Sequence, residues 1–362
     1  MMASSFLKHP TVPFRVKPGK TAATILDEML LTGFQGKALG EAFAIWQEIL
    51  RQKKITIWLG ISGAIIPAGM RRIIAYLIEK RFVDVIVSTG AQVFHDAAEA
   101  LGVVHYRGSA LADDQALLAE GIDRFYDVLV QEHQQRRVDR QIQHFIETLD
   151  EGYQYSSREF LFLLGQYLGK HGQARDSFLV QAARSGVPVF APALCDSSIG
   201  YSFVMARRGI SDAADGRTFK QTGKKVFRYI DQMKDTDETV RIAEKTPHSA
   251  VIYLGGGVPK NFIQQTELLS LILGHSLPGH EYAIQLTTDS PQFGGLSGCT
   301  FAEAQSWGKI ARHAKTVQCS CDVTIGLPLL AQGLAEKEKL ATRRPKPRFT
   351  WGDDNLGIKY ER

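Results

Sequence analysis

Six short runs rich in β-branched and aromatic residues recur along this chain, and segments of helical composition separate them. Such alternation is typical of a mostly parallel sheet with helices on both faces. The expected strands are 55–60, 83–89, 187–194, 250–257, 281–288 and 317–325. The expected helices include 68–80, 96–102, 157–171, 223–244 and 260–273. The pattern therefore predicts an α/β fold with a doubly wound, Rossmann-like sheet in a single large domain.

The sequence contains no repeat of fixed period and no Pro-, Gly- or Ser-rich linker that would divide it. We predict a helical N-terminal extension over 1–50, one large domain over 51–335 and a charged tail over 336–362. Within the tail, the run 336–348 has the composition of a charged terminal helix.

The composition is that of an ordinary globular chain: 362 residues, of which 44% are hydrophobic and 22% charged. A chain of this size can bury a large core. The formal charge of +5 is small, and the basic runs Arg136-Arg137 and 336–348 do not interleave aromatic residues. These features argue against nucleic-acid binding. No signal peptide and no apolar run near eighteen residues is evident, so we expect a cytoplasmic protein that does not enter a membrane.

The four cysteines, Cys195, Cys299, Cys319 and Cys321, lack the paired spacing of a structural zinc site. We therefore expect no bound metal, and reduced thiols. Cys319 and Cys321 are two residues apart in an apolar run, and a strand would place both on one face as small core residues.

Small or polar residues follow several of the expected strands, at the edge where doubly wound sheets bind ligands. Glycines there allow close approach of the backbone, and free N–H groups of a following helix can hold a pyrophosphate. A dinucleotide is the natural ligand, but no turn carries a G-x-G-x-x-G fingerprint, and the glycines at 255–257 could equally form a tight turn. His95-Asp96 could shuttle protons, contact a cofactor or merely begin a helix. Asp196 could bind a ligand or cap a helix.

The run SGCTFAEAQSWGKI, residues 297–310, places Lys309 beside Trp307 and Glu303 after a glycine-rich loop. A lysine amine attacks a carbonyl or imine only when neutral, and an aromatic wall that restricts water favours the neutral form. A nearby carboxylate can anchor a cationic substrate or move protons. The same residues also fit an ordinary capping box from Thr300 to Glu303. On a continuous helix, Glu303 and Trp307 would share a face and Lys309 would point away from Trp307.

Four segments follow one another over most of residues 50–330: GISGAIIPAGMRRIIAYLIEKRFVDVIVSTGA, PVFAPALCDSSIG, VIYLGGGVPKNF and EAQSWGKI. In this order and spacing they resemble the deoxyhypusine synthases, and in particular the bacterial deoxyhypusine synthase-like, homospermidine synthase-like branch. The resemblance implies an NAD-dependent transferase of aminoalkyl groups, of EC 2.5.1 type. It also implies a homotetramer whose active sites lie at subunit interfaces.

In that family, NAD takes a hydride from the carbon beside a secondary amine of spermidine, and diaminopropane leaves. An aminobutyl imine then forms on a lysine, and an acceptor amine displaces it. The resemblance assigns this lysine to Lys309, the wall of the amine site to Trp307, and the binding of an ammonium group or proton transfer to Glu303. NAD and a lysine are complementary requirements of this reaction. Activating an unreactive C–N bond needs a hydride acceptor, and holding the released fragment needs a nucleophile that becomes an imine.

The resemblance also implies the positions that bind cofactor and substrate. For the cofactor they are Gly63, Pro67, Thr89, Gly90, Ala91, His95, Asp196, Gly256, Thr288, Asp289, Asp322 and Val323. For the substrate they are Tyr201, Asn261, Gly295, Leu296 and Ser297.

The sequence departs from the eukaryotic pattern of the family at several of these positions. Tyr201 and Leu296 replace acidic residues that hold the ends of spermidine, and Asn261 replaces a histidine. Among the cofactor positions, Ala64 and Pro67 replace polar residues, and His95 replaces a glutamate. These replacements affect how NAD would be held. With fewer carboxylates, the site suits a different amine, since a lost ion pair in a dry site is worth about 2–5 kcal/mol.

We therefore expect transfer to a small amine such as putrescine, as in homospermidine synthesis. An agmatine-type donor or acceptor would also fit. The alternatives are deoxyhypusine synthesis on a protein lysine, a catalytically idle polyamine- or NAD-binding protein, and an oxidoreductase that releases an aldehyde and accumulates NADH.

Overall fold

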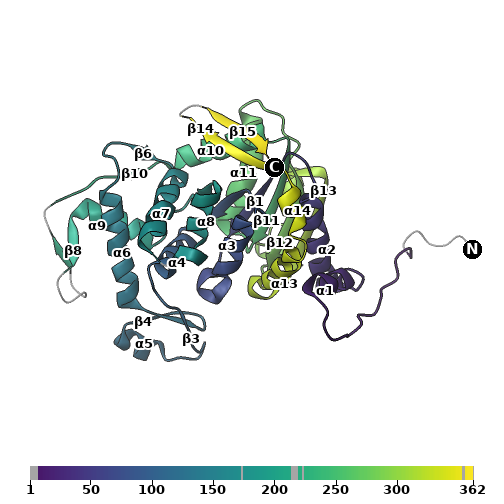
Figure 1. Ribbon diagram of the computed structural model, residues 1–362, viewed down its shortest axis with the longest axis horizontal. Helices are drawn as coiled ribbons and strands as arrows, with labels where there is room; N and C mark the ends of the chain where they lie inside the picture. Colours follow the sequence, from purple (N-terminus) through teal and green to yellow (C-terminus); the bar gives the residue numbers. More distant parts are fainter. Residues whose placement is uncertain (1–6, 173, 213–218, 222–223, 353–354, 362) are drawn as a thin grey trace, which may run out of the picture.

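The computed structural model describes residues 7–172, 174–212, 219–221, 224–352 and 355–361. At its centre lies a six-stranded sheet in the order β13-β12-β11-β1-β2-β7 (Figure 1). The strands are β1 (Ile55–Ile61), β2 (Val85–Ser88), β7 (Val189–Phe190), β11 (His248–Leu254), β12 (His280–Thr287) and β13 (Ile310–Ser320). Every neighbouring pair is parallel. The predicted fold class is confirmed.

The strand order creates one point at which the chain reverses its direction across the sheet. The chain runs outward from β1 through β2 to β7, then returns to the other side of β1 and continues through β11, β12 and β13. The loops that follow β1 and β11 therefore leave in opposite directions. In doubly wound sheets this divergence opens a crevice at the carboxyl ends of the two strands, where ligands bind.

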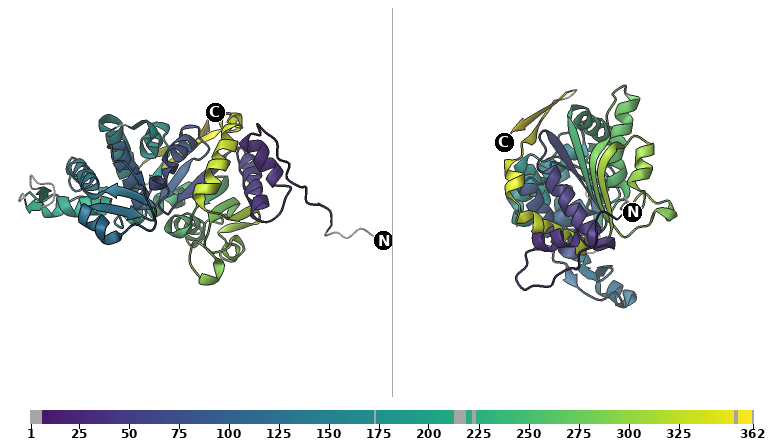
Figure 2. Two further views of the ribbon diagram at one scale, coloured as in Figure 1. Left: turned by 90° about the horizontal axis from the view of Figure 1, so that it is seen from below. Right: turned by 90° about the vertical axis from the view of Figure 1, so that its right-hand side faces the viewer.

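Helices cover both faces of the sheet, as the end-on view shows (Figure 2). Because strand residues alternate in direction, Ile57 and Leu59 belong to the larger core while Trp58 belongs to a smaller one on the opposite face. The larger core takes residues from α1 (Ala22–Met29), α2 (Phe34–Ile49), α3 (Arg71–Glu79), α4 (Gly90–Ala100), α6 (Glu132–Glu147), α7 (Ser157–His171), α8 (Phe178–Ser185), α9 (Ser198–Arg208) and α13 (Val323–Ala335). The smaller core takes residues from α10 (Gln232–Lys245), α11 (Gly257–Ile272) and α12 (Phe301–Ser306).

Smaller elements lie outside the main sheet. An antiparallel sheet of β3 (Tyr106–Arg107), β5 (Val128–Gln131) and β4 (Ile122–Phe125) carries α5 (Asp114–Glu120). Two further pairs are β6 (Gln154–Tyr155) with β10 (Tyr229–Ile230), and β8 (Ile210–Asp212) with β9 (Phe219–Gln221). Short helical turns are η1 (Ile66–Met70), η2 (Ala174–Asp176) and η3 (Pro291–Phe293). Among the described residues, no helix combines the length and the apolar character needed to cross a bilayer.

The last predicted strand, 317–325, is wrong at its carboxyl end. β13 stops at Ser320, and Asp322 caps α13 by accepting a hydrogen bond from the backbone N–H of Thr324 at 2.8 Å. Cys319 is a buried core residue as predicted, but Cys321 lies past the strand and is only partly buried. The run 187–194 also forms a strand of only two residues, and the helix expected at 96–102 begins at Gly90.

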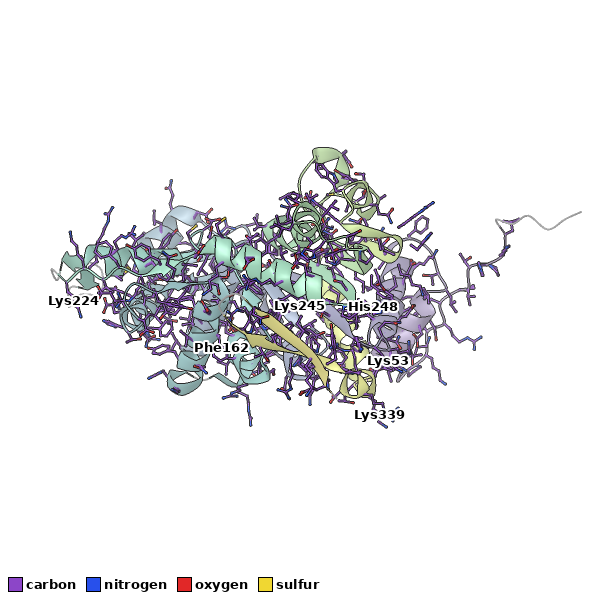
Figure 3. The ribbon with its side chains drawn as sticks, turned by 90° about the horizontal axis from the view of Figure 1, so that it is seen from above. Lys53, Phe162, Lys224, Lys245, His248 and Lys339 are labelled. Carbon is purple, nitrogen blue, oxygen red and sulfur yellow. The ribbon has the colours of Figure 1, made fainter. Side chains whose placement is uncertain are left out.

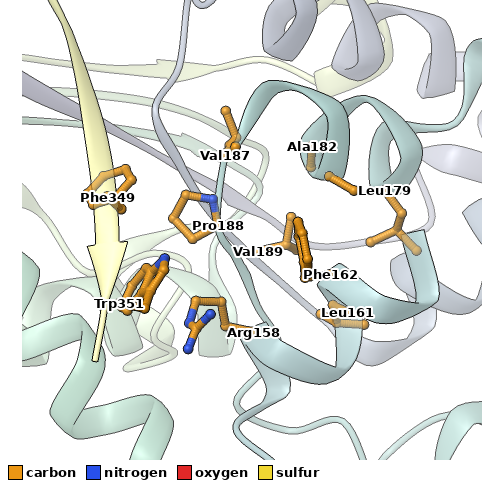
Figure 4. A pocket seen from close by; sticks show the side chains of 12 residues that line it. Arg158, Leu161, Phe162, Leu179, Ala182, Val187, Pro188, Val189, Phe349 and Trp351 are labelled. Atoms are coloured by element: carbon orange, nitrogen blue, oxygen red, sulfur yellow. The ribbon is translucent and has the colours of Figure 1, made fainter. Parts of the chain in front are cut away.

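The tail is more than the charged helix that its composition predicts. That helix, α14, is confined to Lys339–Arg343, and a hairpin of β14 (Lys346–Trp351) and β15 (Leu356–Glu361) follows it. The hairpin borders an apolar cavity of about 240 Å³, in which the Arg158 guanidinium lies 3.8 Å from the centre of the Trp351 ring (Figure 4). Arg158 also forms a two-bond ion pair with Glu238. The contact between Trp351 and Arg158 attaches the end of the chain to α7, which the ion pair with Glu238 connects to α10.

The opposite edge of the sheet carries basic and acidic groups, since His248 pairs there with Glu281 at 2.8 Å. Lys53 precedes β1, Lys245 ends α10 and His248 begins β11, and the three side chains lie on the same side of the molecule (Figure 3). This edge is formed by the amino ends of the parallel strands. The crevice that the strand order predicts must lie at the other edge.

Candidate active site

A cleft of about 1020 Å³ lies at the carboxyl ends of β1, β11, β12 and β13, where the strand order predicts a crevice. Small and polar residues from the four strand ends line it. Seven of the predicted cofactor positions are among them, together with one predicted substrate position: Gly63, Pro67, Gly256, Thr288, Asp289, Asp322, Val323 and Ser297. The structure thus brings together residues that are up to 260 positions apart in the sequence.

The residues that form the opposite wall of this cleft were not predicted from the sequence. It comes from the small β3-β5-β4 sheet and its turn, and it includes His105, Arg107, Phe125 and Tyr126. Tyr126 is 75% exposed and adopts a φ of 57°, a left-handed conformation that is uncommon for a non-glycine residue. Sequence patterns mark these residues as aromatic and basic, but not as neighbours of the main sheet.

The glycines after β11 form a close-packed turn. The backbone N–H of Gly256 donates to Ser62 Oγ at 2.7 Å, and that of Gly257 donates to Ser297 Oγ at 2.9 Å. A Cβ on Gly256 would lie 2.5 Å from the Cα of Ser297. These two N–H groups are therefore satisfied within the protein, which supports the tight-turn interpretation over a phosphate cradle.

The remaining predicted cofactor positions do not line the cleft. His95 is only 6% exposed and lies beneath the wall, with its ring 4.9 Å from that of Phe125 and 5.3 Å from that of His105. Burial, helped by the charge of His105, lowers the pKa of His95 to about 3, so the ring is neutral. The other outlying positions follow β2 and β7 at the same edge of the sheet: Thr89, Gly90, Ala91 and Asp196.

A second cavity, of about 200 Å³, contains the predicted catalytic residues. Lys309, Trp307 and Glu303 line it together with the predicted substrate positions Asn261, Gly295 and Leu296. Sequence reasoning missed Lys260, Gln264 and Cys299, which line it as well. Burial raises the pKa of the Cys299 thiol, so this cysteine does not compete with Lys309 as a nucleophile near neutral pH. Because Leu296 lines this cavity and Ser297 lines the cleft, one loop separates the two spaces.

Lys309 contacts Trp307, and the expectation that a helix would separate them is wrong. Thr300 caps α12 by accepting a hydrogen bond from the Glu303 N–H at 3.0 Å, but the helix ends at Ser306. Gly308 then turns the chain with a φ of 71°. As a result, Lys309 Nζ lies 5.2 Å from the centre of the Trp307 ring. A positive charge on the amine is attracted to such a ring face, whereas the ring is also an apolar wall for the neutral form.

The loop between the cavities is held by three buried or half-buried side chains. Lys260 Nζ donates to Gln285 Oε1 at 2.9 Å and to the carbonyls of Ser297 and Cys299. Gln285 Nε2 donates to the Ser297 carbonyl at 2.8 Å, and Gln318 Nε2 donates to the Cys299 carbonyl at 3.1 Å. Burial lowers the pKa of Lys260 to about 8. We call these three side chains the loop clamp.

We expect Lys260→Met to disturb both cavities. Without the ammonium group, the buried carbonyls of Ser297 and Cys299 lose a donor, and the loop moves relative to Lys309. Displacements of about 1 Å near a reacting group can cost about 100-fold in rate. We expect a comparable loss in kcat/KM for amine transfer, with retained secondary structure by circular dichroism. Lys260→Met with wild-type activity would show that the loop needs no clamp.

The predicted substrate residue Tyr201 lies apart from both cavities. It is on α9 and is 62% exposed, and it lines neither the cleft nor the Lys309 cavity of its own chain. Within one subunit, therefore, the structure does not place Tyr201 near the predicted chemistry.

Fold and site together define an α/β protein with a dinucleotide-sized crevice at the reversal point of its sheet and an adjoining lysine cavity. The family model for deoxyhypusine synthase matches residues 24–334. The chain belongs to the deoxyhypusine synthase family. Members of this family are aminobutyltransferases, so the predicted enzyme class is confirmed.

Curated relatives cover nearly the whole chain. It is 50% identical to "Probable deoxyhypusine synthase 2" of Methanosarcina mazei, over 98% of each chain. It is 48% identical to "Probable deoxyhypusine synthase 2" of Archaeoglobus fulgidus, over 84% of this chain and 95% of the relative. The expected likeness to bacterial proteins is confirmed by the "Deoxyhypusine synthase-like protein" of Chlorobaculum parvum, at 32% identity over 96% and 95% of the chains, although the archaeal relatives are more similar.

A solved structure supports the fold alone. The crystal structure assigned to a deoxyhypusine synthase of Entamoeba histolytica superposes with a TM-score of 0.57 at 16% identity, over 87% of this chain and 93% of the other. At this identity, the match concerns the arrangement of the elements and carries nothing about substrates.

Proposed function

We propose that the protein is an NAD-dependent aminobutyltransferase in which Lys309 forms a covalent imine with the transferred group. The observation that carries the proposal is the convergence of Lys309, Trp307 and Glu303 on one cavity, one loop away from the cleft at the reversal point of the sheet. Every residue that lines either space lies between positions 62 and 324. We therefore keep 51–335 as the catalytic domain.

The large cleft fits NAD in size and chemistry. Its volume of about 1020 Å³ exceeds the about 300–1,000 Å³ of ordinary ligand pockets, and glycines after β1 and β11 let a ligand approach the backbone. Asp289 and Asp322 offer carboxylates that suit ribose hydroxyl groups, and Phe125 and Tyr126 offer aromatic surfaces for a flat ring. When bound there, NAD would supply a hydride acceptor that later returns the hydride.

Residues of the Lys309 cavity would then carry out the transfer of the amine-bearing group. Lys309 must lose a proton, and Glu303, which lines the same cavity, can accept it. The neutral amine attacks the carbon of the substrate imine, a C–N bond forms to Nζ, and diaminopropane leaves as the old C–N bond breaks. Attack by the acceptor amine reverses the sequence and restores Lys309. Trp307 and Leu296 are apolar walls of this cavity, but they are 57% and 49% exposed in a single subunit. A neighbouring subunit must cover them if water is to be excluded and the imine protected from hydrolysis.

A small amine is the acceptor that the Lys309 cavity suits best. The cavity has a volume of about 200 Å³, and Glu303 is the one carboxylate among the residues that line it. Leu296 and Asn261 lie in it as a neutral pair of side chains. This favours an amine with few charges, such as putrescine, and a homospermidine synthase-like reaction.

Deoxyhypusine synthesis on a protein lysine is the second candidate. Its support is the naming of the archaeal relatives, which are up to 50% identical to this chain. The two candidates share the imine on Lys309 and differ only in the acceptor.

Borohydride trapping tests the shared step. The protein is incubated with NAD and, separately, with spermidine, putrescine, homospermidine or agmatine, then reduced and mapped by mass spectrometry. We expect an NAD-dependent adduct on Lys309 whose mass identifies the group. Putrescine and a lysine-bearing acceptor protein then compete for the labelled group, and the product distinguishes the candidates. A folded, NAD-binding protein that gives no adduct with any amine would support an idle binding protein.

We also propose a homotetramer in the cytoplasm, with active sites at subunit interfaces. The four cysteines are unpaired, as expected for a reducing compartment. In such an assembly, the exposed Tyr201 is available to a neighbouring subunit. Analytical ultracentrifugation measures the assembly state, and a monomer with full activity would contradict active sites that lie at subunit interfaces.

We expect Gly256→Ala to weaken NAD binding at least about tenfold. A Cβ at this position would lie 2.5 Å from the Ser297 backbone, so the turn and the loop must separate and the cleft changes shape. A tenfold rise in Kd corresponds to a loss of about 1.4 kcal/mol of binding free energy. Isothermal titration calorimetry measures the affinity. Gly33→Ala is the control, because a Cβ there meets no atom within 4 Å. Equal affinities in both variants would contradict NAD binding at this cleft.

A further inference from the structure

Helix α11 places an unusual row of polar side chains against the sheet. Lys260, Gln264, Glu267 and Ser270 follow at intervals of four and three residues, so they share one face of the helix. Their exposed fractions are 2%, 3%, 6% and 0%. A helix that packs on a sheet normally presents apolar residues there. Lys260 belongs to the loop clamp, whereas Gln264, Glu267 and Ser270 take no part in it.

The sheet also places polar side chains against this face of α11. His280, on β12, is fully buried, and its Nδ1 lies 2.7 Å from Ser249 Oγ and 3.4 Å from Glu267 Oε1. The Tyr253 hydroxyl, on β11, lies near Gln264 and Glu267. Burial raises the pKa of Glu267 to about 7 and lowers that of His280 to about 3. Glu267 and His280 therefore form a buried pair in which the carboxyl group can exchange a proton near neutral pH.

Several atoms of this region have no hydrogen-bond partner among the described residues. They are Gln264 Nε2, Glu267 Oε2, Ser270 Oγ, the Tyr253 hydroxyl and His280 Nε2. Buried polar atoms without partners are rare in native proteins, and internal water usually satisfies them. Three of the five atoms lie on one face of α11 and two on the facing strands, so each is a position at which an internal water molecule could bind.

The row reaches the Lys309 cavity. Lys260 and Gln264 line that cavity, and Glu267 is the next polar residue along the same helix face. At 1.5 Å per residue, Glu267 lies about 10 Å along the helix from Lys260, which a few water molecules can bridge. The backbone also links the two ends, because the His280 N–H donates to the Lys309 carbonyl at 3.1 Å.

We propose that internal water molecules occupy this row and carry protons between the Lys309 cavity and the Glu267–His280 pair. The proton transfer rests on the function proposed above for Lys309. When the ammonium of Lys309 becomes a neutral amine, Glu303 accepts its proton first. The water chain then carries a proton from Glu303 to the Glu267 carboxylate, so that Glu303 is ionised again and Glu267 becomes a carboxylic acid. The proton returns when the lysine is released. No electrons move, and one proton leaves Lys309 for each proton that Glu267 gains.

Few other ionisable groups surround Glu267 among the described residues. His280 and Tyr253 face it from the sheet, and Lys260 lies two turns away on its own helix. From α10, which packs against α11, Glu244 pairs at 3.5 Å with His275, beyond the end of α11. Glu267 is thus the buried carboxylate of this row.

The first test needs no substrate. A crystal structure at a resolution that defines water should contain ordered water between Gln264, Tyr253 and Glu267. Infrared difference spectra recorded across pH 6 to 8 should contain the band of a protonated carboxyl group that titrates near pH 7 and disappears in Glu267→Gln. Direct bonds among these side chains with no water, or a carboxyl group that stays ionised throughout, would overturn the proposal.

The second test measures the rate of imine formation on Lys309 by quenched-flow borohydride trapping. We expect Glu267→Gln to slow this rate about tenfold at pH 7, at the low end of proton-transfer catalysis, with unchanged KM. The rate should recover at high pH, where hydroxide from the bulk solvent can accept the proton in place of Glu267. Glu281→Gln, which changes a partly exposed carboxylate paired with His248, is the matched control and should keep the wild-type rate. Equal rates and pH profiles in both variants would overturn the proton transfer.

The two tests separate this inference from the proposed function. If wild-type protein forms no adduct with any amine, the function fails, while the water and the carboxyl band still decide the polar row. If adducts form but neither water nor the band is found, the function stands and the row is only structural.

Discussion

Replacing Lys309 by alanine is expected to abolish the covalent adduct and to reduce amine transfer at least about 1,000-fold. The amine on Lys309 is the nucleophile of the proposed reaction, and the cavity offers no equivalent group. Lys260 is clamped by the carbonyls of Ser297 and Cys299, and Cys299 is kept protonated by its raised pKa. NAD binding should be unchanged, since Lys309 does not line the large cleft. Borohydride trapping and product analysis measure the loss.

The control for this variant is Lys315→Ala. Lys315 lies on β13, six residues after Lys309, and its side chain is exposed and paired with Glu48 of α2. The control should keep both the adduct and the transfer rate. Full transfer by Lys309→Ala would mean that the acceptor attacks the substrate directly, and the covalent mechanism would be wrong.

The sequence predicts the main sheet well, because its strands are buried on both faces. Such strands are continuous apolar runs, and the segments that connect them have helical composition, so each expected run supplies a strand. The reversal between β1 and β11 then determines where the cleft must lie. Seven of the predicted cofactor positions line it because they lie in the loops after the strands or in the first turn of the helix that follows, at that edge.

Other parts of the site depend on contacts that no local pattern encodes. His105 and Phe125 line the cleft through a small antiparallel sheet whose docking cannot be read from its own short strands. His95 is covered by these residues, so its place beneath the cleft could not be foreseen from its position after β2. Likewise, the contact between Lys309 and Trp307 exists because Gly308 adopts a positive φ after the helix ends. Assigning directions at 100° per residue on a continuous helix cannot predict such a turn.

The second large effect is expected on stability, from a buried ion pair that joins the tail to the sheet. Asp84 and Arg344 are both fully buried at their side chains, and two hydrogen bonds of 2.8 and 2.9 Å connect them. Asp84 also accepts hydrogen bonds from Arg81 and from the backbone N–H of Ile57 in β1. A single carboxylate thus pairs with two arginines and holds β1 through the N–H of Ile57.

We expect Asp84→Asn to lower the free energy of unfolding by about 3–5 kcal/mol, because it leaves the guanidinium of Arg344 buried without a counter-charge. The amide keeps the shape of the side chain, so a change in packing would not explain the loss. Asp176→Asn removes an exposed ion pair with Arg72 and should cost less than about 1 kcal/mol. Denaturant unfolding at fixed protein concentration compares the two variants. Since the tail then detaches more easily from β1, limited proteolysis with trypsin should cleave first after Arg343 in Asp84→Asn. Equal stabilities would mean that water reaches this pair and screens it.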